Sequence, residues 1–309
     1  MNIIPIVFAF DDKLILPACV CINSLLMNAD KDTYYDIYIL HSEKYSFIDT
    51  ELVNFPHLYS NCNITFRTVY NEFVAAYEVR GITTTAYYRL LIPELIPEYD
   101  KILYSDVDVI FRSDMLKYYQ VDLEDYYMAG VDCGIIMTPK GKKYIVNQLG
   151  IDPQSGYFYS GNLLINSALI RKDNLISVFK ELSKESFQHQ DMDIINIACN
   201  GKIKRLPLAF CLTNYINEAI VKKDDLMLKY YNKAELLYAL NEGIVHFNGP
   251  KPWKQYCVHF DVWWEYYRKS PFFIESFYFD FFNQKQDEYD RLPFWKRVKI
   301  LLRYFLFKK

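Results

Sequence analysis

Two aspartates one residue apart, Asp106 and Asp108, lie in an apolar stretch in the middle of the chain. The stretch covers residues 101–111 and reads KILYSDVDVIF. Its branched residues predict a β-strand inside a sheet, where an unpaired carboxylate is costly to bury. The strand therefore either ends here and exposes both side chains, or places them on a cation. Such a pair suits Mg²⁺ or Mn²⁺ better than zinc, although alone it is more often an ordinary strand-to-loop corner.

The surrounding elements predict an α/β fold. Apolar runs at 3–10, 35–40 and 63–69 predict strands, and residues 14–27 show the apolar spacing of a helix. This alternation is typical of a βαβ series over a mostly parallel sheet. Further strands are predicted at 128–132 and at 156–166, where Gly161 indicates a bulge or a close backbone approach. Three strands lead into acids, at Asp11, Asp106 and Asp132, and ligands of open α/β sheets bind just beyond the carboxyl ends of strands.

The segments between and after these strands contain further polar side chains. Residues 83–90 lead into a helix that Pro93 cuts short, with Arg89 about one turn into it. Residues 186–199 predict a helix that begins near Asp191, where an acid also has the plain explanation of favourable interaction with the helix dipole. Residues 245–253 contain His246 in a Gly/Pro-rich loop with too little regularity for a strand or helix. A dinucleotide or ATP site is disfavoured, because no glycine-rich phosphate motif follows the first strand.

The composition limits the class of protein. A chain of 309 residues with 51% hydrophobic residues can form one large α/β domain with an appendage, or two domains. The net charge of −3 argues against a nucleic-acid partner. Seven scattered cysteines without a C-x-x-C pair predict reduced thiols. With no recognisable signal peptide and no membrane-spanning apolar run, we expect a cytoplasmic protein.

The carboxyl-terminal segment differs from the rest of the chain. Residues 259–282 are rich in aromatic residues, which we expect to pack on the main domain rather than stack on sugars. Residues 291–309 carry seven Lys or Arg and no acid, which leaves a formal charge of −10 for the remainder. As a helix, residues 293–309 place Phe294, Val298, Leu301 and Phe305 on one stripe and basic residues on another. This pattern predicts an interfacial helix on an anionic membrane, with a helix packed on the protein or a disordered end as alternatives.

Six short motifs occur together and in a recognisable order. They are IVFAFDD at 6–12, TTAYYRL at 84–90, LYSDVD at 103–108, SGNLLIN at 160–166, QDMD at 190–193 and HFNGPKPW at 246–253. The combination resembles glycosyltransferase family 8, whose members are retaining enzymes of the GT-A fold. Bacterial lipopolysaccharide glucosyl- and galactosyltransferases are the most similar group. The resemblance covers about residues 3–255.

The resemblance implies a fold, a reaction and a cofactor. It predicts a GT-A catalytic domain over residues 1–255, a mostly parallel Rossmann-like sheet flanked by helices, with residues 256–309 as a helical appendage. The implied reaction moves a hexose from UDP-glucose or UDP-galactose to a glycan acceptor, expected to be lipid-linked, at the inner face of the plasma membrane. By resemblance, Asp106, Asp108 and His246 hold Mn²⁺ or Mg²⁺, and Lys251 brings a positive charge to the diphosphate.

Other matched positions are implied in binding and catalysis. Ala9 and Asp11 match positions that bind the uracil and ribose of UDP. Arg89 and Asp191 match contacts to the donor sugar, and Asp132 matches a position beside the sugar and acceptor. The catalytic candidates are therefore Asp191, Arg89 and Asp132. The full predicted donor and cofactor set is Ala9, Asp11, Arg89, Asp106, Val107, Asp132, Ser160, Asp191, His246, Gly249 and Lys251.

Two residues depart from the family pattern. Tyr159 replaces an amide that contacts the donor sugar, which leaves the choice of donor open. Met192 replaces a glutamine near the anomeric carbon, and a thioether is neither a strong hydrogen-bonding group nor a useful nucleophile. An active enzyme would then use same-face substitution assisted by the departing diphosphate, with Asp191 as the candidate nucleophile of a double displacement. The alternatives are a membrane-associated nucleotide-sugar-binding protein with little transfer activity, a sugar-nucleotide pyrophosphorylase, and a self-glycosylating priming protein.

Overall fold

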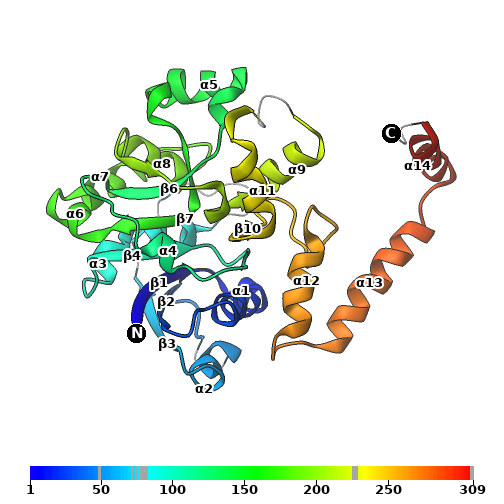
Figure 1. Cartoon of the computed structure of the whole chain (residues 1–309), viewed down its shortest axis with the longest axis horizontal. Helices are drawn as coiled ribbons and strands as arrows, with labels where there is room; N and C mark the ends of the chain where they lie inside the picture. Colours follow the sequence, from blue (N-terminus) through cyan, green and yellow to red (C-terminus); the bar gives the residue numbers. More distant parts are fainter. Residues whose placement is uncertain (48–49, 71, 74–75, 77–82, 225–228, 307–309) are drawn as a thin grey trace.

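The computed structural model describes residues 1–47, 50–70, 72–73, 76, 83–224 and 229–306. Its main sheet has the strand order β3-β2-β1-β4-β7-β6-β8 and helices on both faces (Figure 1). All neighbouring strands in this sheet are parallel except the pairs that β7 makes with β4 and β6. The strands are β1 (Asn2–Ala9), β2 (Thr33–Ser42), β3 (Cys62–Val69), β4 (Lys101–Ser105), β6 (Met128–Asp132), β7 (Phe158–Asn166) and β8 (Ile203–Arg205). The predicted mixed, mostly parallel sheet is confirmed.

The first part of the chain forms the predicted βαβ series. Because β1 is covered on both faces, Ile4, Ile6 and Phe8 join one hydrophobic cluster while Val7 joins the opposite one. After β1 comes a short 3₁₀ turn, η1 (Asp12–Leu14), and then helix α1 (Ile15–Met27). Between β2 and β3 lie η2 (Glu51–Asn54) and α2 (Phe55–Leu58). The three strands run parallel in continuous register.

The stretch 101–111 is not one strand. It divides into β4 and β5 (Val109–Phe111), which belong to different sheets, and the two aspartates lie in the bend between them. The reason is that β5 leaves the main sheet to pair with β10 (Ile244–His246), which in turn pairs with β9 (Leu212–Thr213). His246 is therefore the last residue of a strand, which corrects the loop prediction for this position.

A second correction concerns Pro93. The segment before it is a 3₁₀ helix, η3 (Thr84–Leu91), and α3 (Ile92–Leu95) begins immediately afterwards. Pro93 lies in the first turn of α3, where the missing N–H costs no helical hydrogen bond. The proline thus starts this short α-helix instead of ending it.

The remaining elements before residue 250 surround the second half of the main sheet. They comprise α4 (Leu116–Tyr119), η4 (Ile135–Met137), α5 (Pro139–Lys143), η5 (Tyr144–Gln148), η6 (Pro153–Ser155), α6 (Ser167–Lys172), α7 (Leu175–Leu182), α8 (Asp191–Ala198), η7 (Leu208–Phe210), α9 (Asn214–Val221) and α11 (Lys233–Asn241). Arg112 joins α11 to the bend after β5, since its guanidinium donates to the carbonyls of Ala239, Leu240 and Glu242 at 2.6–2.9 Å. This contact fixes the approach to β10.

The carboxyl-terminal segment is helical, as predicted. Helix α12 (Phe260–Lys269) packs on the domain, because Trp263, Trp264 and Tyr267 form one buried cluster with residues of α1, β5 and β10. The first half of helix α13 (Glu275–Asp290) packs against α12, since Phe281 joins the same cluster. Helix α14 (Phe294–Leu306) follows at the outer end of this segment (Figure 1). The described residues contain no helix long and apolar enough to span a bilayer.

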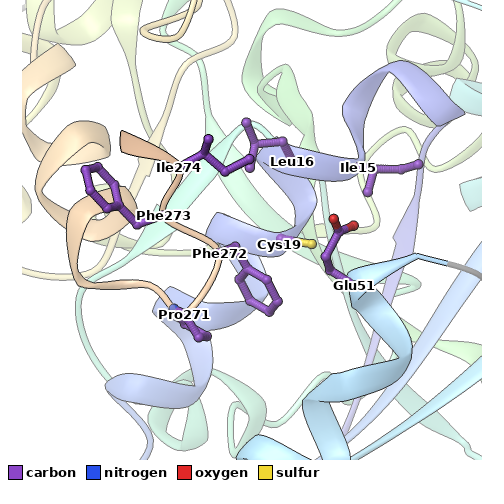
Figure 2. Close-up of a pocket in the computed structure, with 8 residues that line it drawn as sticks. All are labelled: Ile15, Leu16, Cys19, Glu51, Pro271, Phe272, Phe273 and Ile274. Carbon is purple, nitrogen blue, oxygen red and sulfur yellow. The ribbon is translucent and has the colours of Figure 1, made fainter. Parts of the chain in front are cut away.

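The turn between α12 and α13 encloses a small apolar cavity against the start of α1 (Figure 2). The cavity has a volume of about 430 Å³, and Glu51 supplies its one carboxylate. Its lining residues are Ile15, Leu16, Cys19, Glu51, Pro271, Phe272, Phe273 and Ile274. The cavity therefore marks where the carboxyl-terminal segment meets the domain.

Candidate active site

Asp106, Asp108 and His246 form one cluster. One potential ligand atom from each lies within 4.8 Å of the others. The His246 Nε2 atom lies 3.1 Å from Asp108 Oδ1 and 3.6 Å from Asp106 Oδ2. Cation ligands at right angles, each about 2.1 Å from the ion, are separated by about 3.0 Å. The spacing of the three atoms thus fits one small divalent cation.

Strand pairing brings the imidazole to the carboxylates. In the antiparallel ladder of β5 and β10, His246 is opposite Val109, the residue after Asp108. The Phe247 N–H also donates to the Asp108 carbonyl at 2.9 Å, so the exchange of backbone hydrogen bonds continues past the strand ends. On the other side of the bend, the Asp106 N–H donates to the Gly161 carbonyl at 2.8 Å. The backbone therefore fixes all three side chains.

Gly161 confirms the predicted close backbone approach. A Cβ atom at this position would lie 2.7 Å from Asp106 Oδ2 and 3.0 Å from His246 Nδ1, which is too close for both. The site therefore requires a residue without a side chain at the centre of β7. This requirement explains the glycine in an otherwise bulky strand.

Lys251 reaches the same cluster. Its ammonium group forms an ion pair with Asp108 Oδ2 and donates to the Phe247 carbonyl at 2.7 Å. Burial alone would raise the pKa of Asp108, but Lys251 and His246 outweigh it and hold that pKa below its ordinary value. Burial also opposes protonation of His246, yet the Asp108 charge raises the His246 pKa to about 10. Without a cation, the Asp108 carboxylate is thus neutralised by an ammonium and an imidazolium.

Arg89 joins the metal cluster to the start of α8. Its guanidinium bonds Asp106 Oδ1 at 2.9 Å and the Ser160 carbonyl at 2.7 Å, and its Nε lies 3.2 Å from Asp191 Oδ2. The side chain is 6% exposed, and it lies 4.5 Å from the centre of the Tyr104 ring. Burial raises the pKa of Asp191, although Arg89 opposes this effect. Arg89 thus forms two intramolecular ion pairs, and they bring Asp106 and Asp191 together.

Asp132 belongs to a separate hydrogen-bonded group at the end of β6. Its carboxylate accepts from the Gly134 N–H at 2.9 Å and from the Tyr230 hydroxyl at 2.5 Å, and its carbonyl accepts from Tyr231. Burial raises the pKa of Asp132. The described residues show no direct bond between this group and the metal cluster, so Asp132 remains a prediction.

The other predicted residues lie near the same edge of the sheet. Val7 pairs with Tyr104 in parallel register, which places Ala9 level with Asp106. Asp11 caps the turn after β1 by accepting from the Lys13 N–H at 3.1 Å. Val107 is buried in the core cluster behind the bend. A Cβ at Gly249 would be 3.7 Å from Asn214, an ordinary contact.

The sequence prediction missed two residues that contact the ligand side chains. The Tyr104 hydroxyl donates to Asp106 Oδ1 at 2.8 Å, and Cys211 Sγ lies 3.4 Å from His246 Nδ1. Tyr104 belongs to the motif at 103–108 and lies two residues before Asp106. Residues two apart in a strand point to the same face, so this spacing could have indicated the contact. Cys211 had no such signal, because it lies 35 residues from its partner.

The fold and this site together define a class of enzyme. A mostly parallel sheet carries a carboxylate pair, an imidazole, a lysine and an arginine beyond the ends of β1 and β4, an arrangement suited to a cation and a diphosphate. The chain matches Glycosyl transferase family 8 over residues 5–257 and belongs to that family. It is a glycosyltransferase of the GT-A fold, and the expected hexosyltransferase class is confirmed at the level of this family.

Individual relatives agree with this assignment. A candidate glycosyltransferase of Haemophilus influenzae is 25% identical, over 87% of this chain and 84% of that protein. The lipopolysaccharide 1,2-glucosyltransferase of Escherichia coli is 23% identical, over 81% of this chain and 73% of that protein. The galactosyltransferase LgtC, solved with donor and acceptor sugar analogues, superposes with a TM-score of 0.70 at 25% identity, over 88% of this chain and 98% of that one. Members of this fold use a nucleotide-sugar donor and a divalent metal.

Proposed function

We propose that this protein is a retaining hexosyltransferase that moves glucose or galactose from a UDP-sugar to a surface glycan such as lipopolysaccharide, with Mn²⁺ as the preferred cation. The similarity to a glucosyltransferase and a galactosyltransferase supports a hexose donor. Two carboxylates and one imidazole form a mixed ligand set that suits Mn²⁺, with Mg²⁺ as the alternative. We further propose residues 1–255 as the catalytic domain.

The observation that carries the proposal is the convergence of His246 on the pair Asp106 and Asp108. The histidine lies 140 residues from Asp106 in the chain, yet the two side chains are 3.6 Å apart. A bound divalent cation supplies Lewis-acid stabilisation of the negative charge that develops on a departing diphosphate. Lys251 lies on the Asp108 side of the cluster and adds a second positive charge there. Arg89 adds a third on the Asp106 side.

For the chemical step we propose same-face substitution. Met192 cannot act as nucleophile or base, and its side chain is half-buried against the core. Asp191 is 6% exposed, and its Oδ2 atom is enclosed beside Arg89. A double displacement through Asp191 would therefore require this carboxylate to leave its ion pair. In same-face substitution, Arg89 and Asp191 instead orient the donor sugar.

We also propose that α14 holds the enzyme on an anionic membrane that carries the acceptor. Phe294, Trp295, Leu301 and Phe305 are each more than half exposed. The helix contains Lys296, Arg297, Lys299 and Arg303 and no acid. An exposed apolar stripe beside basic residues matches an interfacial helix. This arrangement would place the protein at the inner face of the plasma membrane.

The test of the reaction is UDP release from UDP-glucose and UDP-galactose with Mn²⁺ and a lipid-linked glycan extract. The activity of the Asp108→Ala variant should be more than 100-fold lower than that of wild type, because a cation ligand is lost. A 100-fold decrease corresponds to an increase of about 2.7 kcal/mol in the activation free energy. Asp173→Asn is the matched control, because Asp173 is an exposed carboxylate whose hydrogen bond from the Tyr127 hydroxyl lies outside the metal cluster.

Three outcomes would contradict the proposal. Undiminished turnover in Asp108→Ala would remove the metal assignment. Tight UDP binding without transfer to any acceptor would indicate the nucleotide-sugar-binding alternative. Exchange of pyrophosphate into the donor would indicate a pyrophosphorylase. For the membrane, removal of residues 293–309 should abolish sedimentation with phosphatidylglycerol vesicles, and equal binding to phosphatidylcholine vesicles would refute the electrostatic contribution.

A further inference from the structure

The two side chains that hold Asp106 and His246 from behind suggest a second layer of the metal site. This inference rests on the proposed cation at Asp106, Asp108 and His246. We propose that Tyr104 and Cys211 are positioning residues that determine which atom of Asp106 and which nitrogen of His246 face the cation.

The two oxygens of Asp106 have different surroundings. Oδ1 accepts from Arg89 Nη2 at 2.9 Å and from the Tyr104 hydroxyl at 2.8 Å. Oδ2 is the oxygen that lies 3.6 Å from His246 Nε2. Two donors thus occupy one oxygen and direct the other toward the cation. Arg89 also contacts Asp191 and Ser160. The Tyr104 hydroxyl, in contrast, forms a hydrogen bond to Asp106 and to no other described residue.

The two nitrogens of His246 are divided in the same way. Nε2 faces the carboxylates, and Nδ1 lies 3.4 Å from Cys211 Sγ. A cation can bind Nε2 only through its lone pair, so the ring proton must then be on Nδ1. The sulfur is placed to accept that proton in a hydrogen bond. A partner at the second nitrogen fixes both the tautomer and the orientation of a ligating imidazole.

Both positioning side chains are held rigidly. Tyr104 is 1% exposed, lies on β4 two residues before Asp106 and packs its ring against the Arg89 guanidinium. Cys211 is fully buried and directly precedes β9, whose Thr213 pairs with His246 in the parallel ladder. Neither side chain is placed to contact a cation itself, because each lies on the far side of its ligand residue. Their effect must therefore act through Asp106 and His246.

The experiment measures the dissociation constant of Mn²⁺ alone, from the electron paramagnetic resonance signal of free Mn²⁺, in the full-length protein without donor. Tyr104→Phe retains the ring and removes only the hydroxyl, and Cys211→Ala removes the sulfur. Each should weaken Mn²⁺ binding about 10–100-fold. Cys211→Ser should recover part of the loss, because its hydroxyl can still accept from Nδ1 over a longer gap. Melting temperatures without metal report separately on folding.

The matched controls are Tyr35→Phe and Cys199→Ala. Tyr35 is a buried tyrosine on β2 whose hydroxyl bonds Asp114 and the Met115 N–H, outside the metal cluster. Cys199 is a buried thiol next to α8. Both controls should lower stability and leave the Mn²⁺ dissociation constant within twofold of wild type. Wild-type affinity in Tyr104→Phe and Cys211→Ala, or an equal loss in the controls, would overturn the inference. If the wild-type protein itself bound no Mn²⁺, the proposed cation site would fail first.

Discussion

Replacement of Gly161 by alanine tests the geometry of the whole site with a single methyl group. Ordinary contact of a Cβ atom begins at 3.4 Å, whereas this Cβ would lie 2.7 Å from Asp106 Oδ2 and nearer still to the His246 ring. Asp106 must therefore move by about 0.7 Å and the imidazole by more. Metal sites tolerate about 0.2 Å of deviation in a ligand distance, so both ligands would leave the range in which they bind one cation together.

We expect Gly161→Ala to lower kcat/KM by about 100-fold, the usual effect of a displacement of about 1 Å in an active site. This change corresponds to about 2.7 kcal/mol of transition-state stabilisation. The loss should appear in Mn²⁺ affinity as well as in turnover. Mn²⁺ titration and UDP release at several Mn²⁺ concentrations would measure the two effects separately.

Gly130→Ala is the matched control outside the predicted donor and cofactor residues. Its Cβ would meet the end of the Leu163 side chain at 3.1 Å and no cation ligand, so we expect Mn²⁺ affinity and activity within about threefold of wild type. If Gly161→Ala bound Mn²⁺ with wild-type affinity while remaining folded, the three side chains could not be the ligands in this arrangement. An equal loss in both glycine variants would show that the region is sensitive for another reason.

Three further predictions follow from other parts of the structure. Because the His246 pKa is raised to about 10 from an ordinary 6.5, Mn²⁺ must displace a proton from His246, and Mn²⁺ affinity should rise with pH up to about pH 10. Titration calorimetry in buffers of different ionisation enthalpy should show about one proton released per ion at pH 7.5. In the metal-free protein, the His246 contribution to stability is complete below pH 6.5 and is lost as the pH rises through about 10. Gly243→Ala should lower the free energy of unfolding by more than about 2 kcal/mol in urea denaturation, because Gly243 has φ of +80° and its Cβ would overlap the Ala209 carbonyl; an unchanged midpoint would contradict this. Trp264→Ala should lower the free energy of unfolding by about 3–5 kcal/mol. It should also make α13 susceptible to limited proteolysis, because Trp264 packs on Phe281 with ring centres 4.7 Å apart. Resistance to proteolysis equal to that of wild type would contradict this prediction.

The predicted strands illustrate what periodicity alone can establish. The boundaries predicted at 128–132 match β6, and those at 3–10 and 63–69 match β1 and β3 within one residue. These segments are long enough, and apolar on enough positions, for local pattern and burial to agree. The predicted loop at 245–253 was wrong at its start, because a three-residue strand such as β10 exists only through pairing with β5 and β9. Three residues are too few to show the alternation of apolar and polar side chains that marks a strand in a sequence.

The break between Asp106 and Asp108 has a similar origin. Residues 101–111 read as one strand because both halves are apolar, and β4 and β5 are each indeed buried strands. Nothing local shows that they belong to two sheets. That division depends on the partner of β5, which lies more than 130 residues later in the chain. The order of motifs indicated that His246 is a ligand, but it could not show that His246 lies opposite Val109. That position depends on the pairing of β10 with β5.

The sequence by itself determined the chemical types of the site: a carboxylate pair after a strand, an arginine, a lysine, a histidine and the glycine between them. It also determined the family and the alternation of strands and helices, since these depend on residue identity and local spacing. Only the tertiary structure decided that Arg89 is shared between Asp106 and Asp191, that Lys251 reaches Asp108, and that Tyr104 and Cys211 contact the ligands from behind. The physical reason is that such contacts depend on the direction of side chains across paired strands, and that direction is fixed by packing partners far away in the chain.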